Sequence, residues 1–308
     1  MTIVPALTAA FIYNPVAGTL RRDPARVIQA MAVLRANGYE VREMPTTGPQ
    51  MAGRLARQAV EQGVDLVVSC GGDGTINETA AGMIGSHTPF LALPGGTANV
   101  LCMETGLGRD MVRAAERVRE LKPRRIAVGR YGERPFLLMA GIGLDAHIVE
   151  HLNPESKKRW GKLAYWIAGC QAILRWLPEF DVRVNGQQHR VSMALVTRVR
   201  NYGGDLEIAR RVSLTDDDFE VILLRGRAAL RYGLYFGGIL TNTLQHMPGV
   251  NIVRTREIEV ADSPHAPIYA QLDGEAAGRV PGRIQIVPDA LTILLPPEYG
   301  SWTTSPTH

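Results

Sequence analysis

A run of glycines with one aspartate among them, CGGDGTINE, occupies Cys70 to Glu78. It follows the apolar run DLVVSC, typical of a buried strand, and precedes a helical pattern at about 76–83. Glycines at the end of a strand let the backbone approach a phosphate, and the next helix offers free N–H groups. The loop has neither a Walker A lysine nor GxGxxG spacing, so it predicts either an anion-binding loop or a tight turn without a ligand.

A second loop of the same kind favours a nucleotide site. LPGGTANV, at 93–100, also follows an apolar run and precedes a helical stretch, while YNPVAG and PTTG end the first two predicted strands. Ligands of open α/β sheets bind at the carboxyl ends of the strands. Four polar or glycine-rich endings at one edge therefore predict one nucleotide crevice, in which the hydroxyls of Thr75 and Thr97 donate to phosphate.

Asp73 lies in the middle of the first loop. A carboxylate repels phosphate, so an aspartate beside a nucleotide needs a cation between them, and Mg²⁺ takes carboxylate and phosphate oxygens together. The alternative is that Asp73 caps the helix that follows by accepting a backbone N–H. The two roles are compatible, and the spacing does not choose between them.

The loops are expected within a repeated strand–helix pattern. Predicted strands lie at 9–14, 39–44, 65–70 and 89–94, and predicted helices at 25–37, 50–63 and 76–83. This alternation predicts an open, mostly parallel sheet with helices on both faces. We assign it to an N-terminal α/β domain, residues 1–124, on which about the last 15–20 residues of the chain are expected to pack.

From residue 125 onward, strand patterns follow one another with few helices between them. Asn185-Gly186 is the expected turn of a hairpin at 180–199, and helices are expected only near 157–177 and 228–243. The sequence therefore predicts a second domain, residues 125–290, that is mainly β and sandwich-like.

Composition narrows the class of protein. The 308 residues are 45% hydrophobic and 21% charged, as in ordinary globular proteins, and 34 basic residues nearly balance 30 acidic ones, which argues against a nucleic-acid partner. Cys70, Cys102 and Cys170 are far apart and form no CxxC, so we expect reduced, buried thiols. The N-terminus lacks the basic region of a signal peptide and no apolar run reaches the ~20 residues of a spanning helix, so we expect a cytoplasmic protein.

Taken in order, these motifs resemble the catalytic domain of the diacylglycerol and sphingosine kinase family, in its soluble bacterial lipid-kinase branch. NPVAG, GGDGTINE and PGGTAN are similar to the early motifs of that family, and AGIGLDA (140–146), LTDDDFEV (214–221) and LDGE (272–275) to the later ones. The similarity runs from about residue 10 to 295. It implies an α/β domain like those of phosphofructokinases and NAD kinases, followed by the β-rich domain.

The resemblance implies that the chain uses ATP and Mg²⁺ to phosphorylate a lipid hydroxyl. Asp273 would be the general base that accepts the hydroxyl proton, with Glu275 beside it and Asp73 acting through the catalytic metal. Without the resemblance, LDGE predicts only an acidic turn. The implied ATP site comprises Asn14, Thr46, Gly71, Gly72, Asp73, Gly74, Thr75, Asn77, Glu78, Gly96 and Thr97.

SLTDDDF resembles a structural magnesium loop of bacterial members of the family. The matching residues are Ser213, Asp216 and Asp218, with Asp216 supplying the carboxylate and nearby backbone carbonyls completing the site. A solvated acidic turn is the alternative. The family often has glycine where this chain has Asp217, which leaves the turn geometry and the ion open.

A second departure concerns the catalytic metal. Many bacterial members have an aspartate directly after GTAN, in a water-bridged network to that metal, whereas this chain has Val100. Asp73 and Asp145 remain as the carboxylates that could take part. The family's three-carboxylate network cannot form here.

Membrane access is expected from KKRWGKLAYWIAGCQAILRW, at 157–176. A basic start with interfacial aromatic residues suits peripheral contact with anionic headgroups. A core helix with a solvated charged end is the alternative.

Three functions stay open at this stage. The first is an ATP-dependent lipid kinase acting on a diacylglycerol-like or sphingoid substrate presented at a membrane surface. The second is an NAD-kinase-like enzyme, against which the PGGTAN loop and the 157–176 segment argue. The third is a nucleotide-binding regulator without catalysis, against which Asp273 and Glu275 argue. The sequence names neither the lipid nor the oligomeric state, for which a homodimer is one option.

Overall fold

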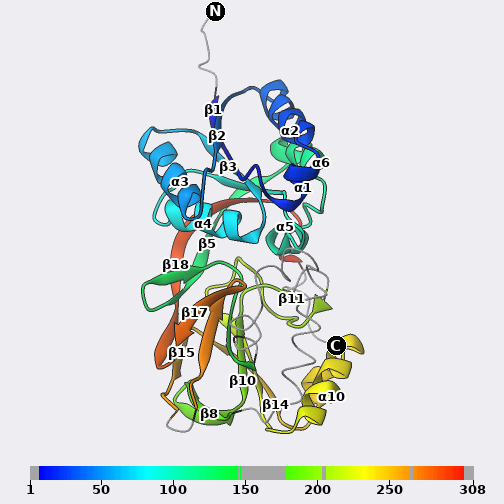
Figure 1. Ribbon diagram of the computed structural model, residues 1–308, viewed down its shortest axis with the longest axis vertical. Coiled ribbons are helices and arrows are strands. Elements are labelled where there is room, and N and C mark those ends of the chain that lie inside the picture. The colour runs from blue at the N-terminus through cyan, green and yellow to red at the C-terminus, as the bar shows by residue number, and fades with distance from the viewer. Residues whose placement is uncertain (1–6, 145, 147–177, 203–205, 264–265, 302–308) are drawn as a thin grey trace, which may run out of the picture. The chain divides into compact units, whose positions relative to one another are not determined.

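The computed structural model describes residues 7–144, 146, 178–202, 206–263 and 266–301 (Figure 1). The chain divides into two compact units. Unit 1 comprises residues 1–127 and 288–308, and unit 2 comprises residues 128–287. The strands β5 (Lys122–Tyr131) and β18 (Gly282–Leu295) contribute residues to both units.

The sheet of unit 1 is mostly parallel, as predicted. Its order is β2 (Tyr39–Pro45), β1 (Leu7–Tyr13), β3 (Leu66–Gly71), β4 (Phe90–Pro94) and then the C-terminal part of β18, and the pairs along this path are parallel. Strands β3 and β4 are buried throughout, which explains why their sequences are continuous apolar runs without alternation.

Helices cover both faces of this sheet. Figure 1 shows α2 (Ala25–Ala36) and α6 (Met111–Glu116) on one side and α3 (Met51–Glu61) and α4 (Asp73–Met83) on the other. The short α1 (Gly18–Arg22), α5 (Val100–Glu104) and the 3₁₀ helix η1 (Arg117–Arg119) complete the unit. This arrangement agrees with the predicted open α/β domain.

Glycines set the close packing of α3 on α4. A Cβ on Gly82 would lie 2.2 Å from the carbonyl oxygen of Gly53, and one on Gly53 would lie 2.8 Å from that of Glu78. Any larger residue at either position would force the helices apart. Glycine inside a helix is destabilising because of its low helix propensity. The close contact between the helices explains why glycine occurs at these two positions.

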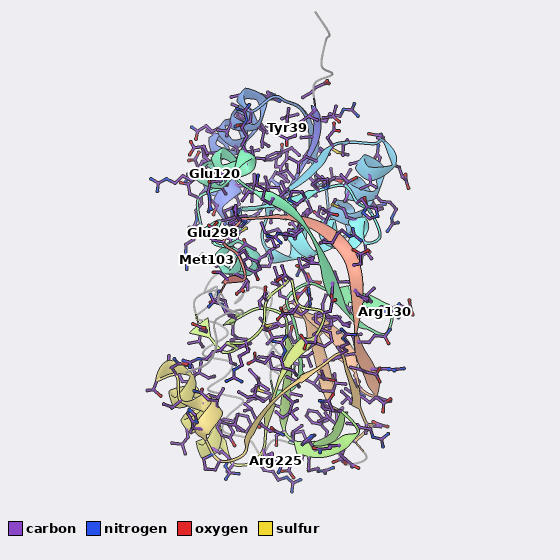
Figure 2. All side chains as sticks on the ribbon, turned by 180° about the vertical axis from the view of Figure 1, so that it is seen from behind. Tyr39, Met103, Glu120, Arg130, Arg225 and Glu298 are labelled. Carbon is purple, nitrogen blue, oxygen red and sulfur yellow. The ribbon has the colours of Figure 1, made fainter. Side chains whose placement is uncertain are left out.

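The C-terminal residues of the described chain pack on unit 1. Tyr299 donates its hydroxyl to Glu104 of α5 at 3.2 Å, and Arg117 pairs with Glu298 at 3.3 Å. Figure 2 shows Glu298 close to Met103 of α5.

Unit 2 is built mainly from antiparallel strands, as predicted. One sheet has the order β14 (Val250–Thr255), β13 (Phe219–Leu224), β10 (Met193–Thr197), β7 (Met139–Gly143), β16 (Tyr269–Leu272) and β17 (Glu275–Arg279). The other strands are β6 (Arg134–Phe136), β8 (Phe180–Val184), β9 (Gln187–Val191) and β15 (Glu257–Val260), together with the small pair β11 (Asn201–Tyr202) and β12 (Leu206–Glu207). One α-helix, α10 (Ala229–Leu240), and the 3₁₀ helix η2 (Leu244–His246) are described in this unit.

The core of unit 2 lies between its two layers of strands. It combines Ala194 and Val221 of the first sheet with Phe180, Ile258 and Ile284 of the other strands. Phe136 and Phe219 stack within it at a centroid distance of 5.8 Å. The hairpin β8–β9 turns at Asn185 and Gly186, both with positive φ, as its Asn-Gly sequence predicts.

Candidate functional site

The carboxyl ends of the four parallel strands of unit 1 meet at one edge. Tyr13 is in register with Pro45 and with Cys70, and Gly71 is in register with Pro94. Beyond these positions the backbone stays joined, because Asn14 N–H donates to Cys70 and Thr46 N–H donates to Tyr13, at 3.2 and 2.8 Å. The segments predicted to form a crevice therefore start side by side.

The two glycine loops touch each other through their backbones. Gly95 N–H donates to the Gly71 carbonyl at 2.8 Å, and a Cβ on Gly96 would lie only 2.5 Å from the Cα of Gly72. Within the first of these loops, the Cβ of Thr75 lies 2.6 Å from where a Cβ on Gly71 would be. Side chains at these glycines would separate the loops, so their sequences are required for the contact.

The loop after β1 joins this pair. Thr19 N–H donates to the Gly95 carbonyl at 3.1 Å and its hydroxyl donates to Gly96 at 3.3 Å. A Cβ on Gly18 would lie 3.3 Å from the hydroxyl of Thr97, whose side chain is exposed. Asn14 shapes its own loop, because its Oδ1 accepts the N–H of Val16 at 3.0 Å. NPVAGT, GGDGT and PGGTAN thus form one continuous surface, called here the loop cluster (14–19, 71–75 and 94–99).

Asn99 closes the third loop and was not among the predicted site residues. Its φ is +52°, its Oδ1 accepts Gly96 N–H at 2.8 Å, and its Nδ2 donates to the Gly96 carbonyl at 3.1 Å. Asparagine tolerates this left-handed conformation and bonds to nearby backbone. An asparagine directly before a helix is the signal that could have identified it.

Asp73 caps a helix, but not the one on which it lies. Its Oδ1 accepts the N–H of Val100 at 2.6 Å and its Oδ2 accepts that of Asn99 at 3.1 Å, so it caps α5 and not α4. Burial raises the pKa of this carboxyl, and the N–H groups of Val100 and Asn99 work in the opposite direction. Asp73 therefore connects the GGDGT loop to the PGGTAN loop.

The donor set at Asp73 fits a magnesium ion that arrives with a nucleotide. Mg²⁺ is commonly held by one or two carboxylates plus substrate phosphates, and each oxygen of an ionised carboxylate accepts more than the single N–H bonded here. In the described part of the chain, Asp73 included, no three His, Cys, Asp or Glu side chains gather in a metal-binding group, so an ion at Asp73 would take its remaining ligands from the nucleotide and water. The side chain of Val100 is buried, so this position contributes only its N–H.

Among the other predicted nucleotide-site residues of unit 1, Glu78 and Thr46 have structural contacts. Glu78 accepts the N–H groups of Gln50 and Ala52 at 3.0 and 3.3 Å, which caps the start of α3. Thr46 is buried beside the end of β1, and Gly74 lies in the first turn of α4. Asn77 Oδ1 is buried and has no hydrogen-bond partner among the described residues, which marks it as an acceptor for water or a ligand.

In unit 2, Asp273 lies in the tight turn between β16 and β17. Leu272 pairs with Glu275, and Asp273 and Gly274 have φ of 50° and 84°, as in the two-residue turns typical of Asp-Gly. The Asp273 carboxylate accepts three backbone N–H groups: Leu137 on Oδ2 at 2.7 Å, and Leu138 and Met139 on Oδ1, both at 2.8 Å. The orientation of this carboxylate is therefore fixed by the backbone at the start of β7.

Glu275 follows in the same turn with an exposed side chain. Gln271, which is buried, accepts the N–H of Gly274 at 2.7 Å and so fixes the other side of the turn. LDGE therefore forms an acidic turn, with Asp273 inside it and Glu275 at the start of β17.

In the loop of unit 2 that was predicted to hold a structural magnesium ion, the aspartates accept hydrogen bonds from an arginine. Arg254 of β14 donates Nη2 to Asp216 at 2.8 Å and Nε to Asp218 at 3.1 Å, and it also bonds to the second oxygen of Asp218. Ser213 turns to its own loop, since its Oγ lies 2.9 Å from the hydroxyl of Thr215. Asp217 is exposed. Sequence reasoning did not identify Arg254.

Some predicted features lie outside the described residues, namely Asp145, Cys170 and the segment 157–176. Cys70 and Cys102 are free and buried, as predicted, and burial raises the pKa of the Cys70 thiol to about 12. Within the described residues, no helix has the length and apolar composition needed to cross a bilayer.

The class of protein follows from comparison with known families and structures. The family model for the diacylglycerol kinase catalytic domain matches residues 8–131, and that for the YegS C-terminal NAD kinase beta sandwich-like domain matches residues 139–295. A crystal structure of a diacylglycerol kinase from Bacillus anthracis has the same fold, with a TM-score of 0.77 at 20% identity over 96% of this chain and 99% of the other.

Curated relatives point to the same family. The diacylglycerol kinase of Bacillus subtilis is 28% identical over 94% of this chain and 97% of its own, and that of Mycobacterium tuberculosis is 27% identical over 87% and 88%. This chain belongs to the family of bacterial diacylglycerol kinases and YegS-like lipid kinases.

Proposed function

We propose that the chain transfers the γ-phosphoryl group of ATP to the hydroxyl of a diacylglycerol-like or sphingoid lipid. The observation that carries the proposal is the loop cluster, in which glycine loops are joined at the carboxyl edge of a parallel sheet. Such an edge is where open α/β sheets bind nucleotides. The family and the names of its relatives support lipid as the acceptor.

The residues of the chain would divide the reaction between positioning and proton transfer. The loop cluster would bind phosphate through backbone N–H groups and the hydroxyls of Thr75 and Thr97. Mg²⁺, when bound with the nucleotide at Asp73, would neutralise phosphate charge. Asp273, held by three N–H groups, would accept the hydroxyl proton of the lipid, with Glu275 next to it.

Labelled ATP and a total lipid extract test this function directly. We expect the purified protein with Mg²⁺ to transfer the terminal phosphate to an organic-soluble product, whose identification names the lipid. A parallel reaction with NAD as acceptor should give no labelled product. Label in NAD phosphate, or ATP binding without transfer to any acceptor, would favour the two other functions left open by the sequence.

The contact between the glycine loops gives a sharper test of the nucleotide site. Gly96→Ala places a methyl group 2.5 Å from the Cα of Gly72, so the loops must separate. Because misplacement of binding groups by about 1 Å is costly, we expect ATP affinity to fall about tenfold or more, measured by calorimetric titration. Gly237→Ala, at a glycine with open space around it, is the control and should bind ATP normally. Equal affinities in the two variants would place the nucleotide elsewhere.

Helix α10 provides a surface that suits the lipid side of this function. The α10 face (Gly233, Leu234, Gly237 and Leu240) leaves Leu234 57% and Leu240 61% exposed, while Tyr232 and Tyr235 hold the opposite face in the unit. No Asp, Glu, Lys or Arg occurs between residues 232 and 245. A helix that faces solvent normally carries charged residues on its exposed face.

Basic residues lie just before this helix and in its first turn. They are Arg225, Arg227 and Arg231, all exposed, with Arg227 paired to Glu179 at 3.5 Å (Arg225 is labelled in Figure 2). Exposed leucines beside arginines complement a membrane surface with anionic headgroups. We propose that the α10 face docks on such a surface to reach the lipid.

Vesicle binding should depend on these leucines. Leu234→Glu with Leu240→Glu should lower the fraction bound to anionic phospholipid vesicles about tenfold, because two apolar side chains no longer enter the interface. Ile28→Glu, which changes a 63% exposed residue of α2, is the matched control and should co-sediment like the unaltered protein. Unchanged sedimentation of the double variant would exclude the α10 face.

A further inference from the structure

The acidic loop at 213–218 has its cation supplied by the chain itself. Arg254 contacts Asp216, both oxygens of Asp218 and the carbonyl of Arg211 with one guanidinium group. Asp216 Oδ2 also accepts the N–H of Ser213 at 3.1 Å. Three of the four carboxylate oxygens of Asp216 and Asp218 are thus already held by a positive group.

The carbonyls of the loop are held by a second arginine. Arg198, which is fully buried, donates Nη2 to the carbonyls of Leu214 at 2.7 Å and of Asp216 at 3.4 Å. Its Nη1 reaches the carbonyl of Leu137 at 3.4 Å. Both kinds of oxygen that the resemblance assigns to the ion, carboxylate and carbonyl, therefore face guanidinium groups.

Electrostatics oppose a divalent cation in this arrangement. A guanidinium never deprotonates in proteins. Burial lowers the pKa of Arg254, but its hydrogen bonds to Asp218 and Asp216 outweigh burial and raise the pKa, so the side chain stays charged. A divalent ion at Asp216 would lie beside this fixed charge and would have to displace it. The residues present do not fit the structural magnesium ion.

We propose that Arg254 and Arg198 replace the structural metal of this loop, so that unit 2 holds it without a divalent cation. Arg254 comes from β14, which pairs with β13 directly after the loop, and Glu220 is opposite Arg254 in the register. The arginine is therefore delivered by the sheet itself. This inference concerns the fold of unit 2 and is independent of the reaction that the protein catalyses.

Thermal unfolding of the nucleotide-free protein tests the inference. We expect the same Tm in excess EDTA and in excess MgCl₂, and no stoichiometric divalent metal in elemental analysis of the purified protein. A fall of Tm in EDTA that disappears in Asp216→Asn would show an ion in the loop and overturn the proposal. A fall that persists in Asp216→Asn would place the ion elsewhere and leave the proposal supported.

Removal of the arginine tests the same point from the other side. Arg254→Met should lower Tm by about 3–8 °C, because two carboxylates lose their counter-charge. In a protein that already carries Asp216→Asn and Asp218→Asn, Arg254→Met should lower Tm by less than half as much, because no carboxylate is left to lose its counter-charge. Arg283→Met, which breaks an exposed pair with Glu257, is the matched control and should change Tm little.

The variants decide in both directions. An Arg254→Met protein as stable as the original, or one whose loss is equal in both backgrounds, would overturn the role of Arg254. If Arg254→Met does not fold, the chelation result on the unaltered protein still decides whether the loop holds a metal.

Discussion

Asp273→Asn is expected to lower phosphoryl transfer by about 10²–10⁴-fold, the range typical of a lost general base. The amide cannot accept the substrate proton. It also cannot reproduce the three contacts of the carboxylate, because its NH₂ group would face the N–H of Leu137 or those of Leu138 and Met139. ATP binding to unit 1 should change less than about twofold, since no residue of the loop cluster is altered. The measurements are initial rates with lipid in vesicles and ATP titration.

A matched control separates catalysis from support of the fold. Asp289 also has a φ of 50°, but its side chain bonds to Arg125, so Asp289→Asn makes the same chemical change at the same backbone conformation. It should leave the rate unchanged. Activity above about 1% in a folded Asp273→Asn protein, or a loss that follows the folded fraction, would remove the base assignment.

The Asp273 turn and the acidic loop are linked through one backbone segment. Leu137 donates its N–H to Asp273 and accepts a hydrogen bond from Arg198 through its carbonyl. Arg198 in turn bonds to the carbonyls of the acidic loop. Two late motifs that are separate in the sequence are therefore connected through hydrogen bonds at the same strand start.

Local signals predicted the parts of the structure that depend on neighbouring residues. The glycine loops lie at strand ends because apolar runs fixed the strands, and Asn185-Gly186 and Asp273-Gly274 adopt positive φ because these dipeptides tolerate it. The mostly parallel sheet followed from the strand–helix alternation.

Partners far apart in the chain could not be predicted in this way. Arg254 pairs with Asp218 across 36 residues, and Asp273 meets the N–H of Leu137 across 136. One of the two interpretations of Asp73 was a cap on the helix next to it, yet it caps α5, 27 residues from it at Val100, because β3 and β4 are adjacent in the sheet. The register of the strands, and not the local pattern, selects these contacts.

Removal of the Asp73 carboxylate should affect stability and nucleotide binding together. Asp73→Ala leaves the N–H groups of Asn99 and Val100 without their acceptor, at a cost of about 1–3 kcal/mol in the free energy of unfolding. It also removes the side-chain contact between GGDGT and the PGGTAN loop and the carboxylate proposed to hold Mg²⁺, so ATP affinity should fall at least tenfold, roughly the effect of a misplaced binding group. Chemical denaturation and ATP titration measure the two effects.

Asp110→Ala is the matched control for Asp73→Ala, because Asp110 also caps a helix, accepting the N–H groups of Val112 and Arg113. It should lose stability but bind ATP normally. Equal loss of ATP affinity in both variants would mean that Asp73 acts only through stability.

The dependence of stability on pH distinguishes the buried carboxyl further. Burial raises the pKa of Asp73 in the folded state above its ordinary value of 3.8, so between these two values the folded protein binds a proton that the unfolded chain has released. The stabilisation due to that proton is complete below 3.8 and is lost as pH rises through the folded-state pKa. Asp73→Asn cannot titrate at this position and is the reference. The free energy of unfolding of the unaltered protein should fall relative to that of Asp73→Asn as pH rises from 3.8 through the folded-state pKa, and the difference between the two proteins should stay constant at higher pH. A difference that does not change with pH in denaturation curves would show that the Asp73 carboxyl is not desolvated in the folded protein.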